Sequence, residues 1–448
     1  MLNSKVISAV VFILFLFGCS IDYRGFGFNV IVITIDALRA DHMSCYGYKK
    51  NTTPNIAKLA ERGVLFENAI SQSSWTKASM ASFFTSLYPH NHKAYPKHSI
   101  LPEDVWTMAE EFKSKGYHTF AIQANGFLKN MYKVDQGFDE YHFSLDLPAQ
   151  QIVDLFNEFL VAKSGKKFFA YLHFMEPHVP YYAPEEYNLK FVDPAYEGVI
   201  DKNQFDKFKE VRSGLLKLSN KEKRHVVDLY DAEIRYADEN IKRMFEKLEE
   251  LNLQQNTIVV IMSDHGEEFW DHNGYEHGHT MYKELLHVPL IIINPKIQRP
   301  KRIKQVVRLI DVYPTLMDIL GFNTQNEFMG QNLAKIMYSY YERNLKLLAF
   351  SEGLLYGPEK KSIQSEHFKL IKKMKDNSLE FYELENDSKE LHDLAGIDKL
   401  DKESHVNFKL FQEYLKEYGE AKSSHYESSQ VELDEETINQ LKALGYVN

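Results

Sequence analysis

Four side chains in separate parts of the chain combine residue types that suit a metal-assisted nucleophilic site. Asp36 follows an apolar run, Asp264 and His265 follow another, and Thr76 precedes a run of small and apolar residues. Two carboxylates, an imidazole and a hydroxyl can ligate one divalent cation, which lowers the pKa of the hydroxyl and makes it a nucleophile. The mostly oxygen donor set suits Mn²⁺, Mg²⁺ or Ca²⁺, and the imidazole leaves Zn²⁺ open.

Thr76 is predicted to lie at the start of a helix. The residues after it are small or apolar, with no Gly or Pro before Pro89, so Thr76 stands in the first turn or directly before it. Unpaired N–H groups and the positive end of the helix dipole favour an anion there, either an alkoxide or a bound phosphate or sulfate. The alternative is that Thr76 is only an N-cap.

The elements that position these side chains are apolar runs alternating with helical segments. This alternation predicts an α/β fold with a doubly wound, mostly parallel sheet. Ligands of such sheets gather at the carboxyl ends of strands, where Asp36 would lie, although a helix N-cap is the alternative for Asp36. Strands are expected at 29–35, 118–122, 168–174, 257–262 and 288–293, and helices at 54–62, 103–115 and 229–251.

The chain divides into parts of different composition. After a linker at 20–28, residues 29–345 form the predicted catalytic domain. Residues 187–223 within it are charged and irregular, and we expect a surface insertion that helps to shape an access channel. Short alternating segments then predict a smaller C-terminal α+β subdomain at 346–448, which ends in a helix near 435–443.

The first residues follow an export pattern, with Lys5 before the apolar run 6–17. The run is short for a membrane span and fits a signal peptide at 1–19, with an uncleaved anchor helix as the alternative. Leu16 to Cys19 resemble a bacterial lipobox, which implies that Cys19 is lipidated. We therefore expect a lipoprotein of the cell envelope, held to a membrane by its lipid on the periplasmic face or at the outer membrane.

Composition excludes some classes of function. The chain has 448 residues, a net charge of −10 and no run of Lys and Arg interleaved with aromatic residues, so we predict no nucleic-acid partner. Its two cysteines imply no disulfide framework. The hydrophobic share of 44% is enough for a large core.

Several ordered motifs resemble the sulfatase family of the alkaline-phosphatase superfamily. They lie at 29–47, 53–89, 176–181, 263–267, 277–289, 381–387 and 441–446. The resemblance implies that Asp36, Asp264 and His265 are metal ligands. It makes Thr76 the nucleophile and fourth ligand, and it implies that His178 contacts the substrate anion or the leaving group.

Three further residues are candidates for binding or catalysis. Sulfatases often carry a Lys in the region of His277 and His279, so either His is a candidate acid for the leaving alcohol, as is His178. A loop hydrogen bonder remains the alternative for one of the two. Asn125 is a candidate for the anion pocket, with a turn residue as the alternative.

The chain also departs from the family pattern. Sulfatases have Cys or Ser followed by x-Pro-x-Arg, and that Cys or Ser becomes formylglycine, whereas this chain has Thr76, Ala78 and Met80 there. Threonine cannot form that aldehyde, and superfamily members with a Thr nucleophile resemble phosphodiesterases and phosphoglycerol or phosphoethanolamine transferases. Ala37 stands where many sulfatases have a second metal-binding Asp. The two-metal members of the superfamily use extra Asp and His ligands, which His178 and the following Tyr181 and Tyr182 match poorly, so we expect one metal ion.

The favoured prediction is a metal-dependent hydrolase that cleaves a phosphoester, or else a sulfoester, through Thr76. Its substrate would be an anionic ester on a small molecule, a lipid headgroup or a glycan. The alternatives are a sulfuric ester hydrolase on sulfated glycans, a phosphoglycerol- or phosphoethanolamine-type transferase, and a non-catalytic binder of anionic glycans.

Overall fold

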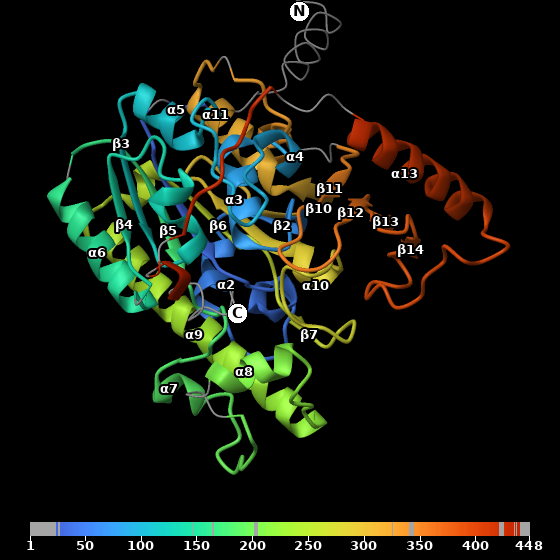
Figure 1. Cartoon of the computed structure of the whole chain (residues 1–448). Coiled ribbons are helices and arrows are strands. Elements are labelled where there is room, and N and C mark those ends of the chain that lie inside the picture. Colours follow the sequence, from blue (N-terminus) through green and yellow to red (C-terminus); the bar gives the residue numbers. More distant parts are fainter. Residues whose placement is uncertain are drawn as a thin grey trace, which may run out of the picture.

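The computed structural model describes residues 24–439 except 26, 146, 164, 201–204, 325, 340–344, 421–424, 434 and 436. A central eight-stranded sheet with helices on both faces dominates the molecule (Figure 1). Its strand order is β10-β2-β9-β6-β1-β5-β3-β4. The strands are β1 (Asn29–Ile35), β2 (Val64–Ile70), β3 (His118–Gln123), β4 (Glu140–Phe143), β5 (Phe168–Phe174), β6 (Thr257–Met262), β9 (His287–Ile293) and β10 (Lys301–Arg308).

The central strand β1 shows why both faces are covered. It pairs in parallel with β5 and β6, and all of its side chains are buried. Val30 and Val32 point into the core beneath one helical layer, while Ile31 and Ile33 point into the other. The first layer contains α3 (Thr76–Thr85), α5 (Met108–Ser114) and α11 (Val312–Leu320), and the second contains α2 (Pro54–Ala60), α6 (Ala149–Ala162) and α9 (Asn220–Glu250).

The structure confirms the doubly wound, mostly parallel sheet. The strand expected at 288–293 is β9, which runs antiparallel to both of its neighbours, β2 and β6. Only the four-residue helix α10 (Lys283–Leu286) precedes it, too short for the crossover that a parallel strand requires. Strand β2 was not expected, because Glu67 and Asn68 interrupt its apolar run where its register with β9 shifts.

Two helices begin elsewhere than predicted, and capping explains both. Helix α5 starts five residues later than 103, where Thr107 and Glu110 form a capping box. Helix α9 starts at Asn220, not at 229, because Ser219 and Glu222 form a second capping box.

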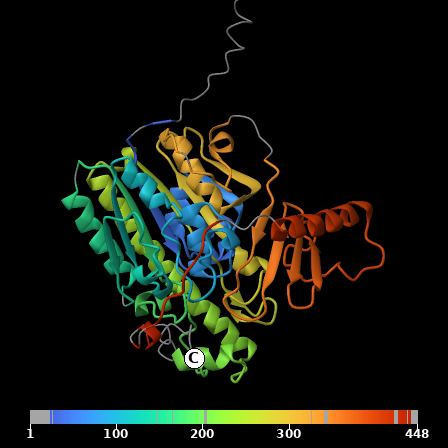
Figure 2. The same cartoon turned by 45° about the horizontal axis from the view of Figure 1, so that its top comes forward.

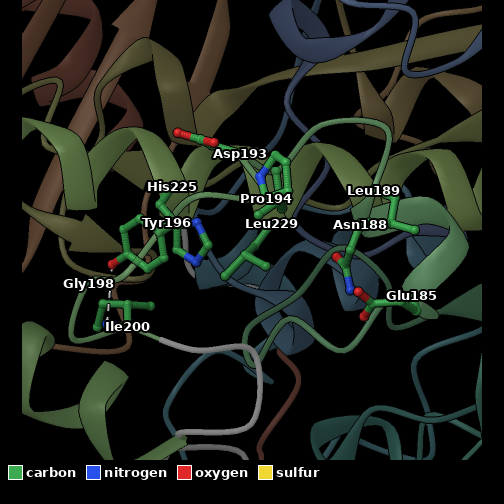
Figure 3. Close-up of a pocket in the computed structure, with 11 residues that line it drawn as sticks. Glu185, Asn188, Leu189, Asp193, Pro194, Tyr196, Gly198, Ile200, His225 and Leu229 are labelled. Carbon is green, nitrogen blue, oxygen red and sulfur yellow. Dashed lines mark hydrogen bonds between the residues drawn. The ribbon is translucent and has the colours of Figure 1, made fainter.

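The segment before α9 therefore ends at Ser219, earlier than the predicted 223, and it is more regular than predicted. It includes α7 (Glu185–Asn188), which begins before residue 187, and α8 (Phe205–Arg212). Figure 3 shows a hollow between this segment and α9.

The C-terminal part forms a small antiparallel sheet of order β11-β12-β13-β14, as the α+β prediction expected. Helix α13 (Lys402–Glu420) packs against it, as Figure 2 shows from a second side. The strands are β11 (Ala349–Ser351), β12 (Lys360–Gln364), β13 (Phe368–Lys373) and β14 (Leu379–Glu383).

Some predictions are not tested by the described residues. Cys19 and the signal peptide lie outside them, the helix near 435–443 lies only partly within them, and the domain boundary at 346 stays a prediction. Among the described residues, no helix combines the length and apolar content needed to cross a membrane.

Candidate active site

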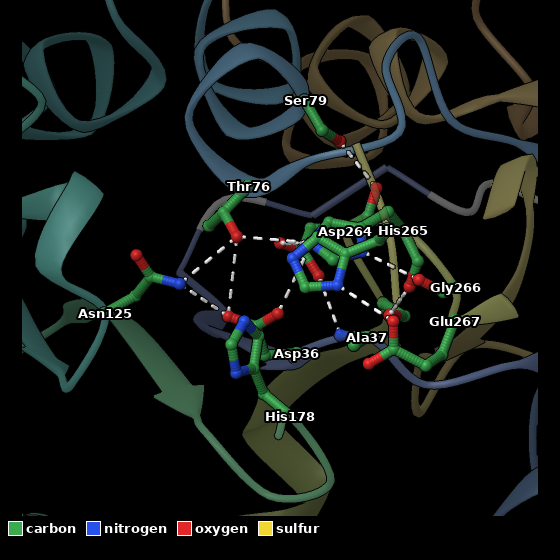
Figure 4. Close-up of polar contacts among 12 residues, drawn as sticks. Asp36, Ala37, Thr76, Ser79, Asn125, His178, Asp264, His265, Gly266 and Glu267 are labelled. Atoms are coloured by element: carbon green, nitrogen blue, oxygen red, sulfur yellow. Dashed lines mark hydrogen bonds and ion pairs between the residues drawn. The ribbon is translucent and has the colours of Figure 1, made fainter. Parts of the chain in front are cut away.

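Thr76 is the first residue of α3, and its hydroxyl lies among polar groups from three other segments (Figure 4). The N-cap is Trp75, and no side-chain cap is formed, so the alternative that Thr76 merely caps the helix is wrong. Thr76 Oγ1 lies 3.2 Å from His265 Nε2 and 3.1 Å from Asn125 Nδ2. It lies 3.5 Å from Asp36 Oδ2.

Asp36, Asp264 and His265 form a buried group at the carboxyl ends of β1 and β6. One donor atom from each lies within 4.8 Å of the others. Asp36 Oδ1 and Asp264 Oδ2 accept no hydrogen bond from any described residue. Buried carboxylate oxygens without partners are costly, and a divalent cation between them would remove that cost. The donor set therefore fits one such ion, and Thr76 Oγ1 can serve as its fourth ligand.

His265 is held in the tautomer that metal binding requires. Its Nδ1 lies 2.9 Å from the carbonyl oxygen of Gly266, which can only accept, so we assign the proton to Nδ1. Nε2 is then unprotonated and faces Thr76. A backbone carbonyl that fixes the second ring nitrogen is a common feature of metal-binding histidines.

The two carboxyl groups have opposite pKa shifts. Burial and the charge of Asp36 raise the pKa of Asp264. For Asp36, burial acts in the same direction, but His178 and His173 outweigh it and hold the pKa below its usual range. Asp36 is thus the carboxylate that the protein stabilises in its ionised form.

Helix α9 holds the turn that carries Asp36. The hydroxyl of Tyr230 donates to Ala37 O at 2.7 Å and accepts from Arg39 N at 2.8 Å. Ala37 has a φ of 56°, so the turn adopts a left-handed conformation that needs such support. Ser263, which follows β6, accepts a hydrogen bond from Leu38 N through its Oγ at 2.9 Å, so the ends of β1 and β6 are tied together.

His173 on β5 is a site residue that the sequence did not reveal. Its Nε2 lies 2.9 Å from Asp36 Oδ2, and its Nδ1 lies 2.6 Å from the Tyr171 hydroxyl. Because it lies within an apolar run, it has the pattern of a core residue. The only available signal was a polar side chain near the end of a strand that neighbours β1.

The structure separates the three candidate acids. The ring centroid of His277 lies 4.3 Å from that of His265 and 4.9 Å from that of His178. His279 is 30% exposed and places Nε2 2.8 Å from Glu268 Oε2. His178 and His277 thus lie next to the metal-ligand candidate His265, whereas His279 pairs with Glu268 away from it.

His178 and His277 differ in the partner of Nδ1. His178 Nδ1 lies 2.5 Å from the carbonyl of Val179, while His277 Nδ1 lies 2.9 Å from Glu267 Oε1. Burial lowers the pKa of both imidazoles and raises that of Glu267 well above its ordinary value. The three groups therefore favour their neutral forms.

Asn125 acts both as a turn residue and as a site residue. Its Oδ1 accepts from Phe127 N at 2.8 Å, which caps a short 3-10 helix. That bond orients the amide, so Nδ2 donates to Asp36 Oδ2 at 2.7 Å and to Thr76 Oγ1. Such a donor beside the hydroxyl suits an anion bound there.

Arg39 has a structural role beside the site. Its guanidinium pairs with Asp41 at 2.9 Å and with Asp271 at 2.8 Å. It also donates to the backbone carbonyl of Glu267 at 3.1 Å, which holds the loop after β6.

Comparison with known proteins gives consistent matches. The family model described as Sulfatase matches residues 28–322, and the model for the C-terminal part of N-sulphoglucosamine sulphohydrolase matches 270–417. An uncharacterized sulfatase, YidJ of Escherichia coli, is 26% identical over 69% of this chain and 71% of its own. An N-acetylglucosamine-6-O-sulfatase of Bacteroides thetaiotaomicron is 23% identical over 87% and 86%.

Two solved structures share the fold. BT4656, in complex with its substrate D-glucosamine-2-N,6-O-disulfate, superposes with a TM-score of 0.75 and 20% identity, over 90% of this chain and 100% of that one. A phosphonate monoester hydrolase of Agrobacterium radiobacter gives a TM-score of 0.73 and 18% identity, over 91% and 98%.

Proposed function

Because the chain belongs to the sulfatase family, whose members hydrolyse ester bonds, we propose that it is a metal-dependent hydrolase that attacks a phosphoester with Thr76. The observation that carries the proposal is the position of Thr76 Oγ1, 3.2 Å from His265 Nε2 and beside two buried carboxylates. A threonine there can attack as an alkoxide but cannot become formylglycine. This favours phosphate over sulfate as the transferred group.

One divalent ion would be held by Asp36, Asp264, His265 and Thr76. Bound there, it supplies positive charge that lowers the pKa of the Thr76 hydroxyl and offsets the two carboxylates. Mn²⁺, Mg²⁺, Ca²⁺ and Zn²⁺ all suit this donor set, and metal analysis distinguishes them.

The chain's own groups then perform the transfer. Thr76 attacks phosphorus in line with the leaving oxygen, and a phosphothreonine forms. Asn125 Nδ2 and the backbone N–H groups at the start of α3 donate to the phosphoryl oxygens, which carry the charge of the transition state. Attack by water, or by an acceptor alcohol in a transferase, would release the group.

The tautomers assign different roles to the two histidines. With Glu267 protonated, the carboxylic acid donates to Nδ1 of His277, whose Nε2 then carries a proton that can pass to the leaving alcohol. His178 donates from Nδ1 to Val179 O, so in this tautomer its Nε2 carries no proton and can accept one from the attacking water. We therefore assign His277 as the acid and His178 as the base.

The location of the protein is part of the same proposal. The apolar run and the lipobox that ends at Cys19 support an exported, lipid-anchored enzyme of the cell envelope. Its substrate would then be an anionic ester of the envelope or its surroundings.

The test compares the full-length protein with Thr76→Ala, after loading with Mn²⁺, on matched aryl phosphate monoester, phosphodiester and sulfate substrates. The proposal expects phosphoester turnover to exceed sulfate turnover and to fall by about a thousandfold or more in the variant. Preference for the sulfate ester would favour the second candidate, a sulfuric ester hydrolase. The relatives that are named as sulfatases of sugars support this candidate.

A further inference from the structure

Lys77 directly follows Thr76 in the chain, and its side chain is completely buried. Its ammonium donates to three backbone carbonyl oxygens, those of Pro96 at 3.0 Å, Lys97 at 2.8 Å and Ser99 at 2.6 Å. An ammonium has three N–H donors, so none is left for the Thr76 hydroxyl or for a phosphoryl oxygen. Lys77 therefore does not serve as an anion-binding group, although it stands next to Thr76.

Burial of this charge is costly, and its surroundings compensate for it without a carboxylate. Among the described residues, no acidic side chain pairs with Lys77. The ammonium instead lies 4.3 Å from the ring centroid of Tyr132, and 5.7 and 5.9 Å from the centroids of Trp75 and Phe127. Ring faces attract a cation as carbonyl oxygens do. We call these three rings the aromatic cage.

The aromatic cage connects two sides of the site. Trp75 is the N-cap of α3, and its ring packs edge to face against Phe127, with 5.1 Å between the centroids. The backbone N–H of Phe127 donates to Asn125 Oδ1, which orients the amide that Figure 4 shows pointing at Thr76. The ammonium thus joins the start of α3 to the segment that carries Asn125.

The segment 96–99 is also bonded on its outer side. Val431 N donates to His98 O at 2.8 Å. Just after the segment, Leu101 N donates to Tyr132 O at 2.9 Å, which joins the segment to the aromatic cage. The buried ammonium is therefore the inner attachment of a segment whose outer attachment is the C-terminal stretch of the chain.

The start of α3 depends on these contacts, because no local side-chain cap fixes it. The N-cap makes no side-chain hydrogen bond, and Thr76 Oγ1 lies by Asn125 and His265 instead. Misplacement of a reacting group by about 1 Å can cost about a hundredfold in rate. The position of Thr76 relative to Asn125 is therefore set by the anchored side chains on either side of it, Trp75 and Lys77.

We propose that Lys77 is a positioning residue, which holds Thr76 and Asn125 at the separation that phosphoryl transfer needs by binding segment 96–99 and the aromatic cage together. This rests on the proposed function and identifies what aligns its nucleophile. Lys77 acts through Thr76 and Asn125 and does not touch the substrate. Loss of the ammonium should therefore slow the chemical step and leave binding of substrate and metal nearly unchanged.

The kinetic test compares the full-length protein with Lys77→Met, which fills nearly the same space without the charge or the donors. Lys369→Met is the matched control, because Lys369 is equally buried but lies in the C-terminal sheet, where it pairs with Glu390 at 2.9 Å. On an aryl phosphate with Mn²⁺, Lys77→Met should lower kcat by about thirtyfold or more and keep KM within about threefold of wild type. Both parameters should stay within about threefold in the control.

Amide hydrogen exchange of the metal-free proteins adds a readout that does not depend on activity. Exchange in segments 96–101 and 125–132 should become faster by about tenfold or more in Lys77→Met, because both segments lose their shared attachment. It should stay unchanged there in Lys369→Met.

Four results would overturn the proposal: a kcat of Lys77→Met within about threefold of wild type, an equal fall of kcat in both lysine variants, unchanged exchange in both segments, or a rise in KM of about tenfold or more, which would make Lys77 a binding residue. If Lys77→Met does not fold, Tyr132→Leu takes its place, since it removes the nearest ring and leaves the three carbonyl bonds. It should lower kcat by about fivefold or more, and an unchanged kcat would overturn the proposal. If wild type cleaves no phosphate ester, the proposed function fails, while hydrogen exchange still decides whether Lys77 orders the two segments.

Discussion

Replacement of Asp264 by Asn should raise the stability of the metal-free protein and reduce the stability that the protein gains from bound metal. The donor atoms of Asp36 and Asp264 lie within 4.8 Å, and Asp264 Oδ2 accepts no hydrogen bond from a described residue. Two unit charges at that separation repel by roughly 3 kcal/mol at an effective dielectric constant near 20. An Asn keeps the oxygen that accepts from Ala37 N at 3.3 Å and removes the charge.

The assay is urea unfolding at pH 8 with EDTA or with Mn²⁺, together with metal analysis of the purified proteins. In EDTA, Asp264→Asn should raise the free energy of unfolding by roughly 1 to 3 kcal/mol. With Mn²⁺, wild type should gain stability and the variant should gain little.

Asp311→Asn is the matched control, because this equally buried carboxylate pairs with Arg308 at 2.7 Å. It should destabilise the protein by about 3 kcal/mol or more with or without metal. If Asp264→Asn lowers stability in EDTA as the control does, Asp264 is a structural acceptor and the reasoning is refuted.

Three further predictions concern the groups around the site. His277→Asn should lower kcat on an aryl phosphate by about a hundredfold or more and His279→Asn by less than about threefold; equal losses would refute the assignment. Tyr230→Phe removes the hydroxyl that bonds to Ala37 O and Arg39 N, so the free energy of unfolding in urea should fall by about 2 kcal/mol. An unchanged free energy of unfolding would contradict the role of Tyr230. Burial raises the pKa of Glu176 from 4.5 to about 7, so this group's contribution to stability is full below pH 4.5 and is lost as the pH rises through 7. Glu176→Gln should therefore match wild type near pH 4.5 and exceed it by up to roughly 3 kcal/mol at pH 8, and a parallel fall of both proteins with pH would contradict this.

The strands that position the site were predictable because they are buried on both faces. Strand β1 and its neighbours β5 and β6 are mostly apolar and buried along their whole length, and Asp36 and Asp264 follow the ends of β1 and β6. Strand direction was not predictable, since β9 has the same composition and runs the other way.

The sequence also did not predict which side chains meet in space. The sequence indicated Asp36, Thr76, Asp264 and His265 as site residues, but residue types alone do not show that their loops meet or distinguish His277 from His279. His173 was not among the candidates, because a histidine within a buried strand looks like any core residue until its partner is known.

The most direct test of the central claim is detection of the covalent intermediate. Wild type and His178→Asn are mixed with an aryl phosphate in the presence of Mn²⁺, quenched in acid, digested and analysed by mass spectrometry. The account predicts a phosphoryl group on Thr76, more abundant in His178→Asn because that variant lacks the base for the second step. Turnover without phosphothreonine, or a phosphoryl group on Ser79 or Ser82 instead, would contradict it.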